Sequence, residues 1–177
     1  DEPGDAQHAL LPDKENPKHD NARKHALWGM WMAGGAGIEW YFGYKHDESD
    51  LTCQDWRSRA NMWDQCRYAL EFFKNNDIPL WEMENHNELI GNTEHTNEKY
   101  CLAKENEIYL VYLAHNPTSS LDLTDANGSF RVRWFNPRKG GKLKKGSVST
   151  VKGGSKVALG KAPADNNEDW LVVIEKK

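Results

Sequence analysis

The sequence lacks three features, each of which would mark a particular class of protein. Its 177 residues include only three cysteines, Cys53, Cys66 and Cys101, so at most one disulfide can form, and their spacing fits no zinc motif. No apolar run reaches the roughly 18 residues that a membrane-spanning helix needs. No internal repeat is present. These absences exclude a disulfide scaffold, a protein with a transmembrane helix and a repeat protein.

The chain also lacks an initiator methionine and a signal peptide. It opens at Asp1-Glu2-Pro3-Gly4, which has the character of an internal stretch. We interpret the sequence as a processed product or as a fragment of a longer protein.

Charge is unevenly distributed along a chain of ordinary globular composition, 38% hydrophobic and 28% charged. Residues 1–99 carry a net charge of −9 and six of the eight tryptophans, whereas residues 100–177 carry a net charge of +5. This break predicts two units, which we call the first unit (1–99) and the second unit (100–177). Lysines in loops and on edge strands usually serve solubility, so we expect neither nucleic acid nor a membrane as a partner.

The first unit alternates between helical and strand patterns. Apolar residues at helical spacing predict a helix over 22–33, with Arg23 and Lys24 on its opposite, polar face. A strand is predicted over 38–42, where Glu39 is the only charged residue. Such a near-continuous apolar run is typical of a strand inside a parallel α/β structure.

A second helix is predicted to follow in the first unit. Thr52 and Asp55 have the capping-box spacing, and an apolar stripe continues to about Asn75. Trp81 and Met83 are expected to pack back onto the helices. Two helices and one strand cannot bury themselves, so the first unit is expected to belong to a larger α/β domain.

The second unit has the pattern of a small antiparallel β-sandwich. Phe130, Val132 and Trp134 alternate with Arg131 and Arg133, which predicts a strand with one core face and one solvated face. Short strands are predicted at 100–103, 108–114, 130–135, 147–151, 156–159 and 170–174.

Two runs are specific enough to indicate a family, namely Ala33–Tyr44 (AGGAGIEWYFGY) and Arg131–Arg138 (RVRWFNPR). Shorter stretches support them: Asp1–Gly4, Leu27–Gly29, Asp55–Ala60, Met62–Phe73, Tyr100–Lys104, Tyr109–Leu113, Gly140-Gly141 and Asp169-Trp170. The first unit resembles the C-terminal end of the (β/α)8 barrel of a bacterial glycoside-hydrolase-like family, related to apiosidase-like enzymes and to retaining barrel glycosidases. The second resembles the small sandwich appended to such barrels, a module labelled "putative collagen-binding domain".

The resemblance implies an α/β plus all-β fold, in which the C-terminal remnant of a (β/α)8 barrel precedes a small antiparallel β-sandwich. Residues 22–33 would be barrel helix seven, 37–43 strand eight and 53–75 helix eight. Barrel active sites lie at the carboxyl ends of the strands. The resemblance therefore places Glu2 just past strand seven, as the catalytic nucleophile. The acid/base carboxylate after strand four has no counterpart in this sequence.

Glu39 allows two interpretations that depend on the parity of its strand. In the favoured one, Glu39 and Tyr41 face the barrel interior, where they could bind sugar hydroxyls or tune the pKa of the nucleophile. In the other, Trp40 stacks on the sugar, and Glu39 pairs behind the strand with an arginine such as Arg57 or Arg59, because an unpaired buried carboxylate is costly.

The loop after this strand is expected to contribute to substrate binding, through Tyr44 and His46. A metal site at Asp47, Glu48 and Asp50 lacks the calcium-loop spacing and its glycine. We therefore expect no metal and no cofactor.

These expectations combine into a function. The chain would be the C-terminal fragment of a retaining glycoside hydrolase that acts on a polysaccharide or oligosaccharide, inactive without the remainder of the barrel. The resemblance implies a secreted or periplasmic location. Two alternatives stay open: a glycan- or collagen-binding module, and a structural buttress.

Overall fold

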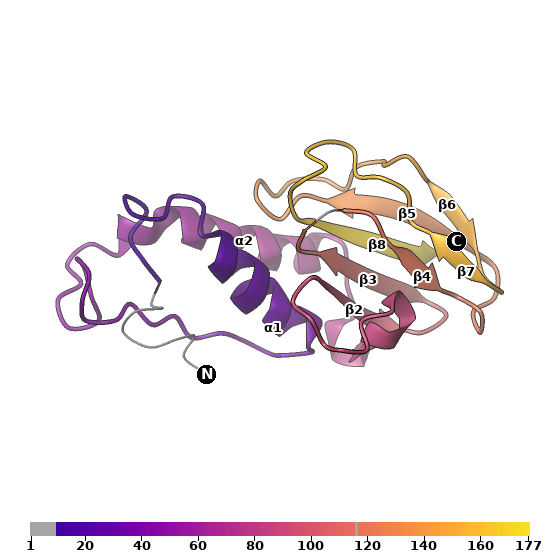
Figure 1. Ribbon diagram of the computed structural model, residues 1–177, viewed down its shortest axis with the longest axis horizontal. Coiled ribbons are helices and arrows are strands. Elements are labelled where there is room, and N and C mark those ends of the chain that lie inside the picture. Colours follow the sequence, from indigo (N-terminus) through magenta and orange to yellow (C-terminus); the bar gives the residue numbers. More distant parts are fainter. Residues whose placement is uncertain (1–9, 116) are drawn as a thin grey trace.

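The structure is a computed structural model that describes residues 10–115 and 117–177. A helical segment precedes two antiparallel sheets (Figure 1). Its helices are the π-helix η1 (Ala22–Leu27), α1 (Trp28–Met32), the 3₁₀-helix η2 (Trp56–Arg59) and α2 (Ala60–Asn75). The short helices η3 (Leu80–Glu82) and η4 (Asn87–Ile90) lead into the sheets. Within the described residues, no helix has both the length and the apolar character to cross a bilayer.

The larger sheet has six strands in the order β1-β2-β3-β8-β5-β6, and the smaller one pairs β4 with β7. The strands are β1 (Glu84–Asn85), β2 (Lys99–Lys104), β3 (Ile108–Leu113), β4 (Ser120–Asp122), β5 (Ser129–Phe135), β6 (Thr150–Lys152), β7 (Lys156–Ala158) and β8 (Trp170–Lys176). Every pairing is antiparallel. The predicted antiparallel character of the second unit is confirmed.

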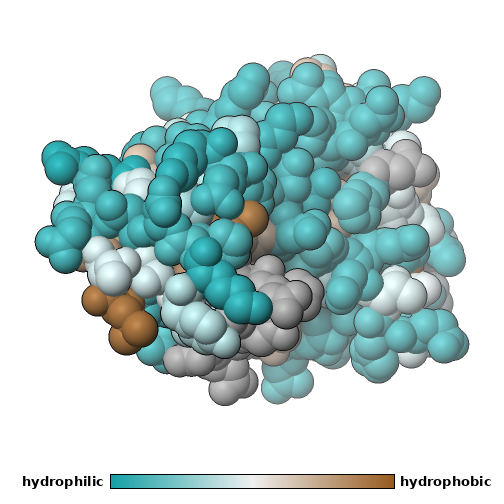
Figure 2. All heavy atoms as spheres, turned by 60° about the vertical axis from the view of Figure 1, so that its left-hand side comes forward, coloured by the Kyte–Doolittle hydropathy of each residue, from teal (hydrophilic) through white to brown (hydrophobic). Residues whose placement is uncertain are grey.

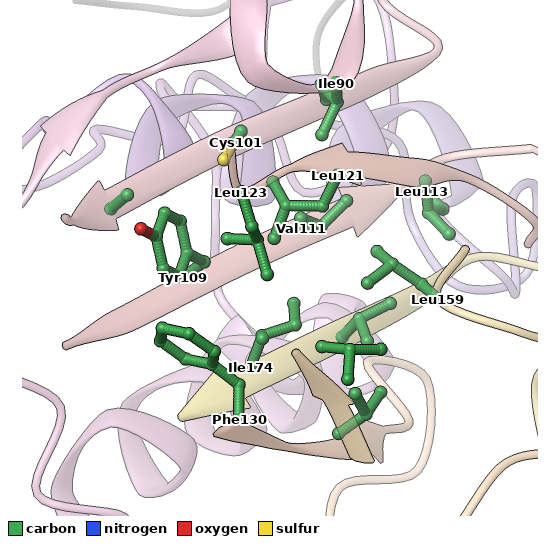
Figure 3. Close-up of a cluster of buried hydrophobic side chains, with 14 of the residues drawn as sticks. Ile90, Cys101, Tyr109, Val111, Leu113, Leu121, Leu123, Phe130, Leu159 and Ile174 are labelled. Atoms are coloured by element: carbon green, nitrogen blue, oxygen red, sulfur yellow. The ribbon is translucent and has the colours of Figure 1, made fainter. Parts of the chain in front are cut away.

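Successive side chains of the large sheet point to opposite faces. Each face is covered by a different core, so the sheet is buried on both sides. Tyr109 and Val111 of β3 join Phe130 in a core that Leu121 and Leu123 from the region of β4 cover from the other side (Figure 3). The predicted alternation of β5 is confirmed, since its core-facing residues are fully buried there, whereas Arg131 is exposed and Arg133 half-buried.

The opposite face of the large sheet packs against the helices. Trp28 of α1 stacks on Tyr112 of β3, with ring centroids 5.4 Å apart and planes 9° apart. Phe72 of α2 lies 4.7 Å from the ring of Phe135 of β5. All four aromatic side chains are at most 1% exposed. The helical segment and the large sheet therefore share one apolar core.

The strand predicted over 38–42 is wrong, because these residues form no regular secondary structure. A strand needs partners for its backbone N–H and C=O groups. Residues 38–42 pair with no strand of the described residues; the carbonyl of Tyr41 accepts from the N–H of Leu10, and the N–H of Phe42 donates to the carboxylate of Asp50. The segment instead lies along the helices, with Ile38 and Phe42 packed against their core.

The helix predictions are confirmed in location and corrected in detail. The first helix covers the predicted range, but Arg23 and Lys24 are buried and not on a solvated face. The second begins later than Thr52 suggests, since Asp55 caps η2 by accepting a hydrogen bond from the N–H of Arg57 at 3.1 Å.

Two further expectations concern the residues after α2. Met83 is buried as predicted, but Trp81 is 84% exposed, so its expected packing onto the helices is wrong. All three cysteines are free.

Candidate functional site

Of the substrate-binding residues predicted from the sequence, Glu39, Trp40 and Tyr41 lie in the irregular segment 38–42, and Tyr44 and His46 lie in the loop that follows it; Glu2 lies outside the described residues. Glu39 is exposed, and Trp40 packs in part against the helical core. Tyr44 is 61% exposed, and the Nδ1 atom of His46 lies 3.3 Å from a carboxylate oxygen of Glu15. Their roles in substrate binding stay predictions.

The arginines suggested for Glu39 bind elsewhere. Arg57 pairs with Asp55 at 2.9 Å. Arg59, which is fully buried, donates to the backbone carbonyls of Leu10 at 3.0 Å and Glu48 at 2.7 Å. The alternative interpretation, in which Glu39 pairs with either arginine, is therefore wrong, since an exposed Glu39 needs no buried partner.

The carboxylates of the loop after residue 44 form ion pairs and hydrogen bonds with nearby residues of the same helical segment. Asp47 forms an ion pair with Lys14, and Glu48 accepts from the N–H groups of Gln54 and Asp55 at 2.6 and 2.9 Å. Across residues 10–115 and 117–177, no three metal-ligating side chains converge.

A buried ion pair joins the helical segment to the large sheet. Arg23 of η1 is 2% exposed, and Asp169, directly before β8, is fully buried. The Nε and Nη2 atoms of Arg23 each donate to one carboxylate oxygen of Asp169 at 2.9 Å. This bidentate arrangement is the strongest geometry for such a pair. Because 146 residues separate the two partners, the pair fixes distant parts of the chain to one another.

Two residues of the sheet complete the surroundings of Asp169. Tyr112 of β3 donates its hydroxyl to Oδ2 at 2.7 Å. Arg138, in the loop after β5, donates to Oδ1 at 3.2 Å and to the backbone carbonyl of Asp169. Its guanidinium also lies 5.3 Å from the ring centroid of Trp170 and pairs with Asp165 at 3.2 Å.

The remaining donors of Arg23 are satisfied within the helical segment. Its Nη2 atom donates to Asp20 at 2.6 Å, and its Nη1 atom donates to the carbonyl of Lys18 at 3.0 Å and to Gln65 at 3.3 Å. A buried charge is tolerated only when it is paired and hydrogen-bonded in this way.

The electrostatics of the cluster keep Asp169 ionised. Burial alone would raise the pKa of its carboxyl, but the hydrogen bonds and charge of Arg23, with contributions from Tyr112 and Arg138, hold that pKa below the usual 3.8. Burial and the neighbouring carboxylate raise the pKa of Tyr112 well above 10, so its hydroxyl stays a donor. The ionic cluster, by which we mean Arg23, Tyr112, Arg138 and Asp169, is thus a fixed structural element at neutral pH.

A polar pocket of about 520 Å³ opens beside the ionic cluster, between the helical segment and the loops of the sandwich. Residues from η1, α2 and the loops before and after the long strands line it: Pro17, Lys18, Asp20, Arg23, Asn61, Asp64, Gln65, Tyr68, Arg138, Lys139, Asp165 and Glu168. Tyr68 packs against Gly140, where an added Cβ atom would come 2.6 Å from its ring.

Sequence reasoning missed both the cluster and the pocket. Helical periodicity placed Arg23 on a solvated face, because Tyr112 and Asp169, which cover that face, are 89 and 146 residues away in the sequence. Arg138 follows the alternating arginines Arg131 and Arg133 closely in the sequence, yet its side chain is only 13% exposed. The one available signal was the Asp169-Trp170 pair, a charge directly before a strongly apolar strand.

Comparisons with known proteins identify the sandwich. Residues 86–175 match the family model described as "Putative collagen-binding domain of a collagenase". No curated protein matches the sequence. The predicted resemblance of the second unit to this module is confirmed.

Two solved structures share the fold. A crystal structure of a glycoside hydrolase family 5 from Bacteroides vulgatus ATCC 8482 gives a TM-score of 0.64 at 16% identity, over 90% of this chain and 36% of that one. A structure named "Glycoside hydrolase" gives 0.64 at 14% identity, over 99% of this chain and 39% of that one. The chain thus spans well under half of each. The barrel remnant and the apiosidase-like relation stay predictions, as does the division at residue 99.

Proposed function

The chain belongs to the family described as "Putative collagen-binding domain of a collagenase", and we propose that it is the C-terminal portion of a glycoside hydrolase whose sandwich buttresses the catalytic barrel. The observation that carries the proposal is the junction between the two parts. One core and one buried, bidentate ion pair fix η1, α1 and α2 to the outer face of the large sheet. We assign these helices to the seventh and eighth of a (β/α)8 barrel, so that the sheet would hold the closing end of the barrel.

The surface of the sandwich favours a buttress over a binding module. One face of its large sheet is covered by the helices. The exposed large hydrophobic side chains of the described residues all precede the sheets: Tyr44, Leu51, Trp56, Leu70 and Trp81. The end of the helical segment, in turn, presents a mainly hydrophilic face with isolated apolar side chains (Figure 2). An aromatic platform for stacking sugar rings or prolines is therefore not found in the described residues from 84 onward.

The proposed reaction is retaining hydrolysis of a glycosidic bond in a polysaccharide. It needs two carboxyl groups about 5 Å apart, one as nucleophile and one as acid/base. We assign the nucleophile to Glu2 and the acid/base to a carboxylate in the remainder of the barrel. Glu39, Trp40, Tyr41, Tyr44 and His46 would line the substrate side, and the parent protein would be secreted or periplasmic. The solved structures named as glycoside hydrolases share the fold of this chain, which supports a glycoside-hydrolase-related parent.

The test uses the longer protein that contains this chain. Its hydrolysis of neutral polysaccharides should be abolished by Glu2→Gln, and retained activity would remove Glu2 as the nucleophile. Asp169→Ala should leave the initial rate at 20 °C unchanged but shorten the half-life of activity on heating. The matched control is Asp165→Ala, because the Asp165 side chain is 48% exposed and, among the described residues, forms an ion pair only with Arg138. Equal half-lives for both variants and the wild type would contradict the buttress.

A further inference from the structure

The polar pocket shares Arg23 and Arg138 with the ionic cluster, and the proposed hydrolysis assigns it no role. Both the helical segment and the loops of the sandwich contribute to its wall. Its volume of about 520 Å³ lies within the range of about 300–1,000 Å³ that is usual for ligand sites.

The lining of the pocket is polar and electrically balanced. Four of its residues are basic and four are acidic, and Pro17 alone of the twelve lacks a polar side-chain group. A charged ligand would find most of these charges already paired, as Arg23 is with Asp169 and Arg138 with Asp165. Amides, carboxylates and cationic groups together offer both acceptors and donors, and a sugar hydroxyl uses both at once. The chemistry thus suits a neutral, polyhydroxylated ligand.

The floor of the pocket is rigid, and its rim carries available groups. Arg23 and Gln65 are buried and held by hydrogen bonds to one another and to the carbonyl of Lys18. At the rim, neither Lys139 nor Glu168 forms an ion pair with any described residue. A fixed floor reduces the entropy lost on binding, and the rim groups can hydrogen-bond to a ligand.

We infer that the polar pocket is a binding site for a neutral oligosaccharide. The pocket chemistry selects a neutral polyhydroxylated ligand, and the choice of an oligosaccharide within that class rests on the proposed function. The helical segment and the sandwich both line the site, so glycan binding should require that the two remain packed together.

The experiment measures binding to the 177-residue chain by isothermal titration and by saturation-transfer NMR. The probes are cellohexaose, xylohexaose, mannohexaose and maltohexaose, with hexagalacturonate as the anionic comparison. At least one neutral hexasaccharide should bind saturably, and hexagalacturonate should not. The double variant Lys139→Ala/Glu168→Ala should weaken that binding at least tenfold.

A charge-matched control is the double variant Lys152→Ala/Glu94→Ala, in which both altered residues are exposed and outside the pocket lining. It should bind as the wild type does. The inference is overturned if no neutral hexasaccharide binds, if only hexagalacturonate binds, or if the pocket variant binds as tightly as the control. The experiment measures binding and not hydrolysis, so a failure of this inference can be distinguished from a failure of the proposed function.

Discussion

Replacing Asp169 by alanine removes the fully buried carboxylate of the ionic cluster. Arg23 then loses two hydrogen bonds of 2.9 Å while it stays buried, and the hydroxyl of Tyr112 loses its acceptor at 2.7 Å. Removing one partner of a buried ion pair costs about 3–5 kcal/mol, because the other charge stays uncompensated. Since Asp20 still pairs with Arg23, we expect the lower end, a loss of about 3 kcal/mol in the free energy of unfolding.

Urea-induced unfolding, followed by tryptophan fluorescence and far-UV circular dichroism, measures this loss. The control Asp165→Ala removes only a half-exposed partner of Arg138 and should cost less than about 1 kcal/mol. In the double variant Arg23→Ala/Asp169→Ala, the loss should be smaller than the sum of the two single losses, because residues in contact couple. A loss for Asp169→Ala no larger than that of the control would refute the reasoning.

Three further predictions follow from the same structure. Tyr112→Phe removes one hydrogen bond to an ionised acceptor and should lower the free energy of unfolding by about 1.5–3 kcal/mol in urea titrations; no change would show that the bond contributes nothing. The lowered pKa of Asp169 gives its carboxylate a stabilising contribution that is complete above the ordinary carboxyl pKa and is lost as the pH falls through the lowered pKa. The difference in the free energy of unfolding between wild type and Asp169→Asn should therefore be constant from neutral pH down to about pH 5 and shrink below about pH 4. A constant difference down to pH 2 would contradict this prediction. Gly153→Ala would place a Cβ atom 2.2 Å from the carbonyl oxygen of Ala126 and should lower the free energy of unfolding by about 1–3 kcal/mol, whereas Gly37→Ala, in open space, should stay within about 0.5 kcal/mol of wild type.

Local patterns predicted the sandwich better than the helical segment. The alternation of Phe130 and Trp134 with arginines depends only on neighbouring residues and on burial of one strand face, so it was readable from the sequence. The run around Glu39 has an equally strong strand pattern, but a strand also needs a neighbouring strand, and residues 38–42 pair with none of the strands of the described residues. Propensity alone could not decide that case.

The junction could not be predicted because its contacts join residues that are distant in the sequence. Arg23 and Asp169 are 146 residues apart, and no periodicity links them. Because a buried arginine is uncommon unless it is paired, the sequence favoured an exposed position for Arg23. The polar pocket depends on that junction and was hidden for the same reason.

The most direct test of the account is whether the helices and the sheet unfold as one unit. Native-state hydrogen exchange, followed by mass spectrometry, reports the opening free energy of α2 and of β3 and β8 separately. A shared core and a buried ion pair predict equal opening free energies for all three elements, and a parallel decrease in Asp169→Ala. Exchange of α2 at a much lower opening free energy than β3 and β8 would contradict the claim that the sheet buttresses the helical segment.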